Sequence, residues 1–268
     1  MKYILGLAFR NVRRNTRRSL LAIISVALAV AFIVAMQGMV GGFMGSMVKN
    51  YTKNETGHVR ITTKEFQEKS RFHPVTENLD NPEEILNTVR THPQLSEQVR
   101  LVTERISFGV VLNRKGKSKT ALALAGDPEV EKDLLMLQKS LLPGGRYIRG
   151  KRETIMGKRI AEALGYGVGD TVKVMTRGSD YALHLRTFAL VGIFETGLKM
   201  MDDAMFQIPL SDAKRLLRMG DDGQQVIVML HDHSQADKAA AAIRDALGND
   251  QSPAVGSGIE GTYGRIFT

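Results

Sequence analysis

The sequence contains one stretch of thirty residues, Ser19 to Val48, without a charged side chain. As an α-helix this stretch would be roughly 45 Å long at about 1.5 Å per residue. The hydrocarbon core of a bilayer is about 30 Å thick and needs about 20 apolar residues to cross it. The next longest apolar run, Thr187 to Phe194, has only the length of a strand. Residues 19–48 are therefore predicted to form one transmembrane helix that extends beyond the apolar layer.

Basic residues precede this helix, and no acidic residue is among them. They are Lys2, Arg10, Arg13, Arg14, Arg17 and Arg18. Basic residues next to a transmembrane helix favour the cytoplasmic side, so we expect a cytoplasmic amino terminus and export of everything after Lys49. A cleaved signal peptide is the alternative, but its apolar core would span only about 7–15 residues. The apolar stretch is about twice that length, which favours a retained anchor.

Residues 1–18 are predicted to form a cytoplasmic elbow helix. Ile4, Leu5 and Phe9 recur at helical spacing, with Arg10 and other arginines on the opposite side. This pattern is typical of a helix lying in the headgroup layer, where arginines contact membrane lipid. The predicted membrane-surface residues are Arg10, Arg13, Arg14, Arg17 and Arg18. A simple positive flank without helical structure fits the same residues.

The second half of the apolar stretch is rich in glycine. Gly38 and Gly42 form one pair at a spacing of four, and Gly41 and Gly45 form another. Small residues at this spacing let two transmembrane helices approach closely. We therefore predict that these four glycines make a helix-packing interface.

Composition excludes several classes of function. The formal net charge is +9, but six positive charges precede Ser19, which leaves +3 for the rest of the chain. The basic excess thus reflects membrane topology, and no nucleic-acid partner is expected. Cysteine is absent, so a disulfide framework, a thiol nucleophile and a cysteine-ligated metal are ruled out.

Residues 49–255 show strand and helix patterns in alternation, which predicts an α+β fold: a mixed α/β domain of two subdomains. A β-hairpin is expected within 99–125, with its turn at 113–117 and Ile106, Phe108, Val110 and Leu112 on one face. Further strands are predicted at 58–62, 154–157, 171–176, 184–194, 204–208 and 225–230. Helices are predicted at 81–91, 130–139, 158–164, 211–217 and 234–247, with Asn81 and Ser211 as caps and Gly165 as a terminator.

Motifs of catalysis are absent: the sequence has no GxSxG, no HExxH and no phosphate-binding GxxxxGK[ST]. The acidic pairs Asp202-Asp203 and Asp221-Asp222 have no histidine at a useful spacing. His231-Asp232-His233 follows a predicted strand, where adjacent side chains diverge. We expect surface or turn roles for all of them, no cofactor, no metal site and no enzymatic activity.

Several sequence blocks resemble one protein family. Gly157 to Asp170, GKRIAEALGYGVGD, is similar to the G-x-x-x-A-x-x-L-x-x-x-x-G-D signature of MacB/FtsX-like ABC transporter permeases. The other similar blocks are Ala8–Asn15, Gly57–Ile61, Phe188–Gly197 and Ile208–Leu217, in the same order as in the family. Among its members, the chain resembles the lipoprotein-releasing permeases most.

The resemblance implies a permease subunit that mechanically couples cytoplasmic ATP hydrolysis to export or extraction of a substrate at the inner membrane, with a lipoprotein as the candidate substrate. Its expected partners are a cytoplasmic ABC ATPase dimer, a second permease subunit (identical or paralogous) and membrane lipid. Residues 49–255 would be a periplasmic MacB-like core. Residues 256–268 would be a linker and the start of a second membrane helix, so the chain would be one segment of a longer permease.

In the lipoprotein-releasing members a protruding loop engages a periplasmic carrier. The corresponding segment here is 175–183, and its candidate partner-binding residues are Met175, Thr176, Arg177, Ser179 and Tyr181. The segment is short and has no proline, which favours an ordinary hairpin tip over binding of a carrier or lipoprotein. The alternative for the whole chain is a membrane-anchored interaction or sensor module without transport activity.

Overall fold

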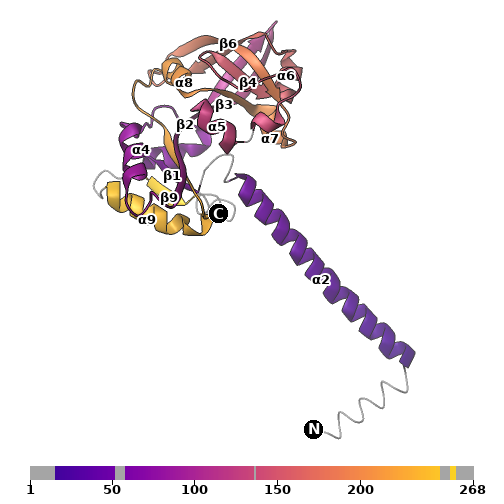
Figure 1. Cartoon of the computed structure of the whole chain (residues 1–268). Helices are drawn as coiled ribbons and strands as arrows, with labels where there is room; N and C mark the ends of the chain where they lie inside the picture. Colours follow the sequence, from indigo (N-terminus) through magenta and orange to yellow (C-terminus); the bar gives the residue numbers. More distant parts are fainter. Residues whose placement is uncertain (1–15, 52–57, 136, 248–253, 258–268) are drawn as a thin grey trace. The chain divides into compact units, whose positions relative to one another are not determined.

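A computed structural model describes residues 16–51, 58–135, 137–247 and 254–257. The chain forms two compact units, the first ending at Asn50 and the second beginning at Tyr51. Figure 1 shows the first as a long helix and the second as a mixed sheet with short helices. The predicted elbow residues Arg10, Arg13 and Arg14 lie outside the described residues.

Helix α2, Thr16–Tyr51, contains 36 residues and confirms the predicted long helix. The large apolar side chains of residues 20–39 are exposed on every side, from 45% for Ile24 to 74% for Met39. Within the described part of the chain, one helix is long and apolar enough to cross a membrane, over Thr16–Met39. A helix that is apolar all round requires an apolar environment.

The second unit contains a sheet with the strand order β3-β7-β4-β6-β5-β2-β8-β1-β9. The strands are β1 (Val59–Thr62), β2 (Val99–Arg114), β3 (Lys117–Gly126), β4 (Glu153–Gly157), β5 (Thr171–Arg177), β6 (Leu183–Phe194), β7 (Met205–Pro209), β8 (Gln225–Leu230) and β9 (Ala254–Ser257). The helices are α3 (Lys64–Lys69), η2 (Ser70–Phe72), α4 (Pro82–Thr91), α5 (Pro128–Leu134), η3 (Leu137–Ser140), α6 (Lys158–Leu164), α7 (Lys199–Ala204), α8 (Leu210–Leu217), η4 (His233–Gln235) and α9 (Ala236–Leu247).

Six of these strands close into a ring, because β2 also pairs with β3. We call the ring formed by β2 to β7 the barrel. The predicted face of the hairpin is confirmed: Ile106 and Phe108 belong to a buried cluster, as do Val110 and Leu112. Small side chains face them across the ladder, since Ile106 pairs with Ala125 and Phe108 with Ala123. Closure removes the free edges that an open sheet would expose.

The other strands continue from the first half of β2 as a four-stranded sheet in the order β2-β8-β1-β9. All of its pairings are antiparallel. The chain order β1-α4-β2-β8-α9-β9 is that of a ferredoxin-like βαββαβ motif. Helices α4 and α9 pack on this sheet (Figure 1), with Ile85, Val89 and Ile243 in its buried cluster.

The barrel is an insertion between the second and third strands of the ferredoxin-like motif. Arg105 marks the change, because it pairs with Gly126 in the barrel and with Gln225 in the four-stranded sheet. This is the mixed α and β fold that the sequence predicts. Its two parts share strand β2 instead of being separated by a linker.

Some local predictions differ from the structure. The helix predicted to start at Ser211 begins at Leu210, because Pro209 supplies the extended residue before it. Helix α7 was not predicted, and the helix expected at 130–139 is divided into α5 and η3. Asn81 precedes α4 as predicted, but it makes no capping hydrogen bond to the helix backbone. Gly256 and Ser257, expected in a linker, pair with β1 as part of β9.

Candidate partner-binding site

The predicted partner-binding loop is the end of the hairpin formed by β5 and β6. Side chains alternate along β5, with Val172, Val174 and Thr176 buried and the residues between them exposed. Met175 pairs with Leu185, and Arg177 pairs with Leu183. Because facing residues of a ladder share one side of the sheet, the outward side chains of the two strands form one surface.

The tip of this hairpin is a hydrogen-bonded turn. The Gly178 amide donates to the Ala182 carbonyl at 2.9 Å, and Tyr181 adopts a left-handed φ of 61°. The carboxylate of Asp180 accepts a hydrogen bond from the Ala182 amide and contacts His184 Nε2 at 2.9 Å. The contact with His184 is the main cause that lowers the pKa of Asp180. The tip therefore has a defined local conformation.

Two of the five predicted residues anchor the hairpin instead of facing outward. The hydroxyl of Thr176 is buried and donates to the Gly109 carbonyl at 2.8 Å. The Ser179 amide donates to the Leu217 carbonyl at 2.8 Å, and its hydroxyl lies 2.9 Å from the Arg218 carbonyl. The sequence placed Thr176 and Ser179 in the loop. It could not show that Ser179 is hydrogen-bonded to the end of α8, which fixes the position of the loop.

The outward surface of the hairpin is apolar. Tyr181, Leu183 and Leu185 are 65%, 72% and 64% exposed, and Met175 is 38% exposed. The guanidinium of Arg177 lies 5.1 Å from the centre of the Tyr181 ring. We call Met175, Arg177, Tyr181, Leu183 and Leu185 the hairpin surface. The predicted segment 175–183 contained Leu183 without naming it as a candidate and ended before Leu185, although the alternation of both with the buried Phe188 and Leu190 indicates an outward position.

The four glycines of the predicted packing interface all lie within α2. A β-carbon placed on Gly38 would meet no atom within 4 Å. Arg17 and Arg18 are exposed in the first turn of the same helix. The structure contains a single copy of the chain, so the packing role of the glycines stays a prediction.

The acidic pair Asp202-Asp203 makes structural contacts. Asp202 is buried and accepts hydrogen bonds from the Thr196 amide at 2.8 Å and the Gly197 amide at 3.0 Å, which fixes the loop after β6. Asp203 lies 3.4 Å from Arg159. Asp232, directly before η4, accepts a hydrogen bond from the Ser234 amide within η4. In the described ranges, no group of three or more histidine or acidic side chains is arranged to hold a metal ion.

A polar group of buried residues joins the barrel to the four-stranded sheet, and we call it the junction. Arg105 and Glu131 form a fully buried ion pair with two hydrogen bonds of 2.9 and 2.6 Å. Glu104 lies 3.0 Å from Lys214. Burial raises the pKa of Glu104, and Lys214 partly opposes that shift.

Gln224 completes the junction. Its side chain accepts the Ser107 amide at 2.6 Å and donates to the Ser107 carbonyl at 2.8 Å and to the Pro74 carbonyl at 2.9 Å. The partners are up to 150 residues apart in sequence. Sequence reasoning missed the junction because no local pattern relates residues at such separations.

These features define an apolar helix suited to a membrane and a two-part domain that offers contact surfaces. The family model described as the MacB-like periplasmic core domain matches residues 19–246. The chain belongs to this family of MacB/FtsX-like ABC transporter permeases. The matched range includes most of α2 and nearly all of the two-part domain.

Solved structures share the fold. The extracellular domain of the noncanonic ABC-type transporter YknZ from Gram-positive bacteria has a TM-score of 0.50 and 18% identity, over 76% of this chain and 100% of that one. The periplasmic region of MacB from Actinobacillus actinomycetemcomitans has a TM-score of 0.53 and 15% identity, over 77% of this chain and 92% of that one.

A curated relative is the lipoprotein-releasing system transmembrane protein LolC of Neisseria meningitidis serogroup B. It is 29% identical over 119 residues, which is 40% of this chain and 29% of the relative. The chain therefore spans less than a third of that relative's length.

Proposed function

We propose that this chain is the anchoring and periplasmic part of an ABC transporter permease subunit. The subunit couples cytoplasmic ATP hydrolysis mechanically to export or extraction of a substrate at the inner membrane. The observation that carries this proposal is the family match over residues 19–246, which includes both the apolar helix and the two-part domain. The basic residues before Ser19 support a cytoplasmic amino terminus and a periplasmic second unit.

In this proposal the domain transmits movement and does not hydrolyse ATP. A separate ATPase dimer supplies the energy, and the four glycines of α2 pack against a helix of a second permease subunit, identical or paralogous. Arg10, Arg13, Arg14, Arg17 and Arg18 contact lipid headgroups. The buried junction supports transmission, because it fastens the barrel to the four-stranded sheet through directional contacts.

The proposed cargo is a lipoprotein, a finer proposal that rests on the name of the LolC relative. The hairpin surface is the proposed contact for a periplasmic carrier or for the lipoprotein itself. Its support is an exposed apolar row on a hairpin that Thr176 and Ser179 anchor to the rest of the domain. The membrane-anchored sensor module remains the second candidate, since an exposed apolar hairpin also suits a partner that is never transported.

The test uses the complete transporter, reconstituted with its ATPase and second permease. The chain contains no cysteine, so introduced cysteines are the only thiols that it contributes. A disulfide between the periplasmic domains of the two permeases should stop substrate release, and reduction should restore it. ATP binding should persist, because coupled sites share a free energy and not an active site.

A matched control carries the same two cysteines without oxidation. Release at the full rate by the crosslinked transporter would contradict the proposal and would mean that the periplasmic domain is a passive docking platform. If the crosslink abolished both ATP binding and substrate release, it would have damaged the assembly. The test would then be repeated with a second cysteine pair.

A further inference from the structure

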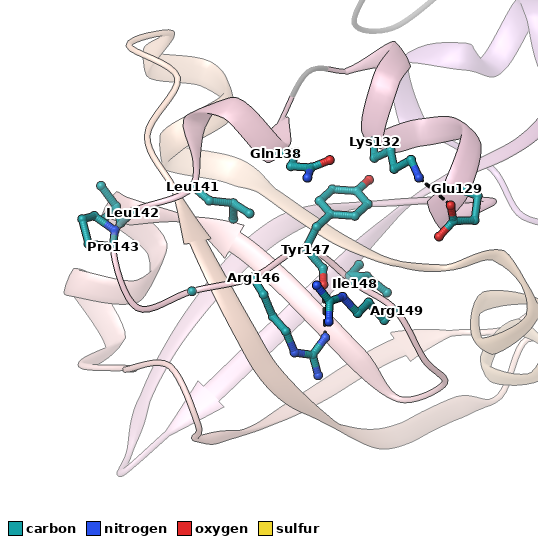
Figure 2. Close-up of a pocket in the computed structure, with 11 residues that line it drawn as sticks. Glu129, Lys132, Gln138, Leu141, Leu142, Pro143, Arg146, Tyr147, Ile148 and Arg149 are labelled. Carbon is teal, nitrogen blue, oxygen red and sulfur yellow. Dashed lines mark hydrogen bonds and ion pairs between the residues drawn. The ribbon is translucent and has the colours of Figure 1, made fainter.

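A cavity of about 540 Å³ lies beside the segment 141–149 of the second unit (Figure 2). Residues of this segment form most of its lining, and Glu129 and Lys132 of α5 and Gln138 of η3 complete it. Its volume lies within the range of about 300–1,000 Å³ that is typical of small-molecule sites. The cavity is separate from the hairpin surface, because their lining residues do not overlap.

The backbone of this segment is fixed without a ligand. The Leu142 amide donates to the Ile193 carbonyl and the Arg146 amide to the Val191 carbonyl, each at 2.8 Å. A β-carbon on Gly145 would lie only 3.0 Å from the α-carbon of Gly192, so the close approach to β6 favours glycine. A preformed wall reduces the ordering cost of binding.

The lining combines apolar and cationic groups. Tyr147 and Ile148 belong to a buried cluster and Leu141 packs against it, which gives the cavity an apolar wall. The Tyr147 hydroxyl is directed into the protein, where it donates to Gln207 Oε1 at 2.9 Å. An apolar wall of this kind can hold a ring or a short alkyl group.

The lining includes three cationic side chains and one carboxylate. Lys132 pairs with Glu129 at 2.5 Å, and Arg146 makes a bidentate pair with Glu153, which lies outside the lining. The hydrogen bond from Arg146 is the main cause that lowers the pKa of Glu153 to about 2. Arg149 is exposed, and none of the ion pairs found among the described residues includes it. Among the three cationic side chains of the lining, Arg149 is therefore the one whose charge no carboxylate of the described residues neutralises.

We propose that this cavity binds a small organic anion, a carboxylate attached to an apolar ring or short chain. The carboxylate contacts the guanidinium of Arg149, and the apolar group lies against Leu141 and Ile148. An arginine suits this role because its fork of donors matches the two oxygens of a carboxylate. Such a carboxylate exists in free small acids and at the carboxyl end of a peptide, and the test separates these sources.

The experiment uses the full chain in lipid nanodiscs and saturation-transfer NMR with benzoate as the probe. Benzoate should receive saturation from the protein, and benzamide, which has the ring without the charge, should receive little. N-acetylphenylalanine tests the peptide source: a stronger signal than that of benzoate assigns the cavity to peptide carboxyl ends, and a weaker signal assigns it to free acids.

Variants locate the binding. Arg149→Glu should weaken benzoate binding about tenfold, since it replaces a charge-assisted hydrogen bond by repulsion. The matched control is Lys151→Glu, which makes the same change of charge at an exposed residue outside the lining. Both variants should keep the thermal unfolding of the parent chain. Equal loss in the two variants, unchanged binding in Arg149→Glu, or equal signals from benzoate and benzamide would each overturn the proposal.

Discussion

Inside the barrel the buried side chains are mainly apolar, whereas at the junction, a few residues earlier on strand β2, they are mainly polar. Phe108, Val110 and Leu112 of β2 face the barrel interior. Thr103, Glu104 and Arg105, which precede them on that strand, are buried as well. Apolar contacts are not directional, so they fill a volume without specifying an orientation.

The polar contacts of the junction have defined partners and angles. Its buried charges and amides are costly unless each one is paired, and this requirement specifies how two elements meet. The difference suggests that the barrel supplies free energy of folding, while the junction determines how the barrel attaches to the four-stranded sheet. The following predictions test this difference in order of decreasing effect.

The largest effect is expected at the buried ion pair. Arg105→Leu should lower the free energy of unfolding by about 3–5 kcal/mol, because it leaves the Glu131 carboxylate buried without its partner. The double variant Arg105→Leu/Glu131→Leu should recover most of that loss. Chemical denaturation of the full chain in nanodiscs measures both values. Additive losses in the double variant would mean that the pair acts by packing alone, as a barrel residue does.

A smaller effect is expected at Gln224. Gln224→Ala should cost about 1–3 kcal/mol, because the Ser107 amide loses its acceptor in a buried position. The neighbouring Gln225→Ala is the matched control, since the only side-chain hydrogen bond that Gln225 makes with another described residue is a long one of 3.4 Å to the Ser107 hydroxyl. Hydrogen exchange of the Ser107 amide should accelerate in the first variant only. Equal destabilisation by both changes would contradict the directional role of Gln224.

The smallest effect concerns an ion pair at the margin of the barrel. The pKa of Glu153 is lowered to about 2 by Arg146, so the folded state holds its proton less tightly than the unfolded chain does. The resulting stability is present above about pH 4.5 and decreases as the pH falls toward 2. Glu153→Gln should remove this part of the acid sensitivity, which unfolding curves at several pH values would detect. An unchanged pH profile would show that the pair contributes no net stability.

Local patterns predicted most of the elements. The hairpin turn at Lys115 and Gly116 has both residues at positive φ, as a two-residue type I′ turn requires, and Gly116 adopts this conformation without a steric cost. Helix α6 spans Lys158–Leu164 as predicted, and Gly165 ends it in the left-handed conformation. These features depend on neighbours a few residues away. For the candidate site, the sequence located the hairpin but not which of its side chains face outward.

The sequence by itself determined the apolar helix, because the uncharged run from Ser19 to Val48 can be recognised without knowing which residues it contacts in the folded protein. It also determined the barrel-facing side of β2, because alternation with a period of two is a local property. Only the tertiary structure decided that β2 pairs with β3, β5 and β8 and that Arg105 meets Glu131. Ring closure and buried pairs join residues far apart in the chain, and their energy depends on geometry that arises only when all the strands are assembled.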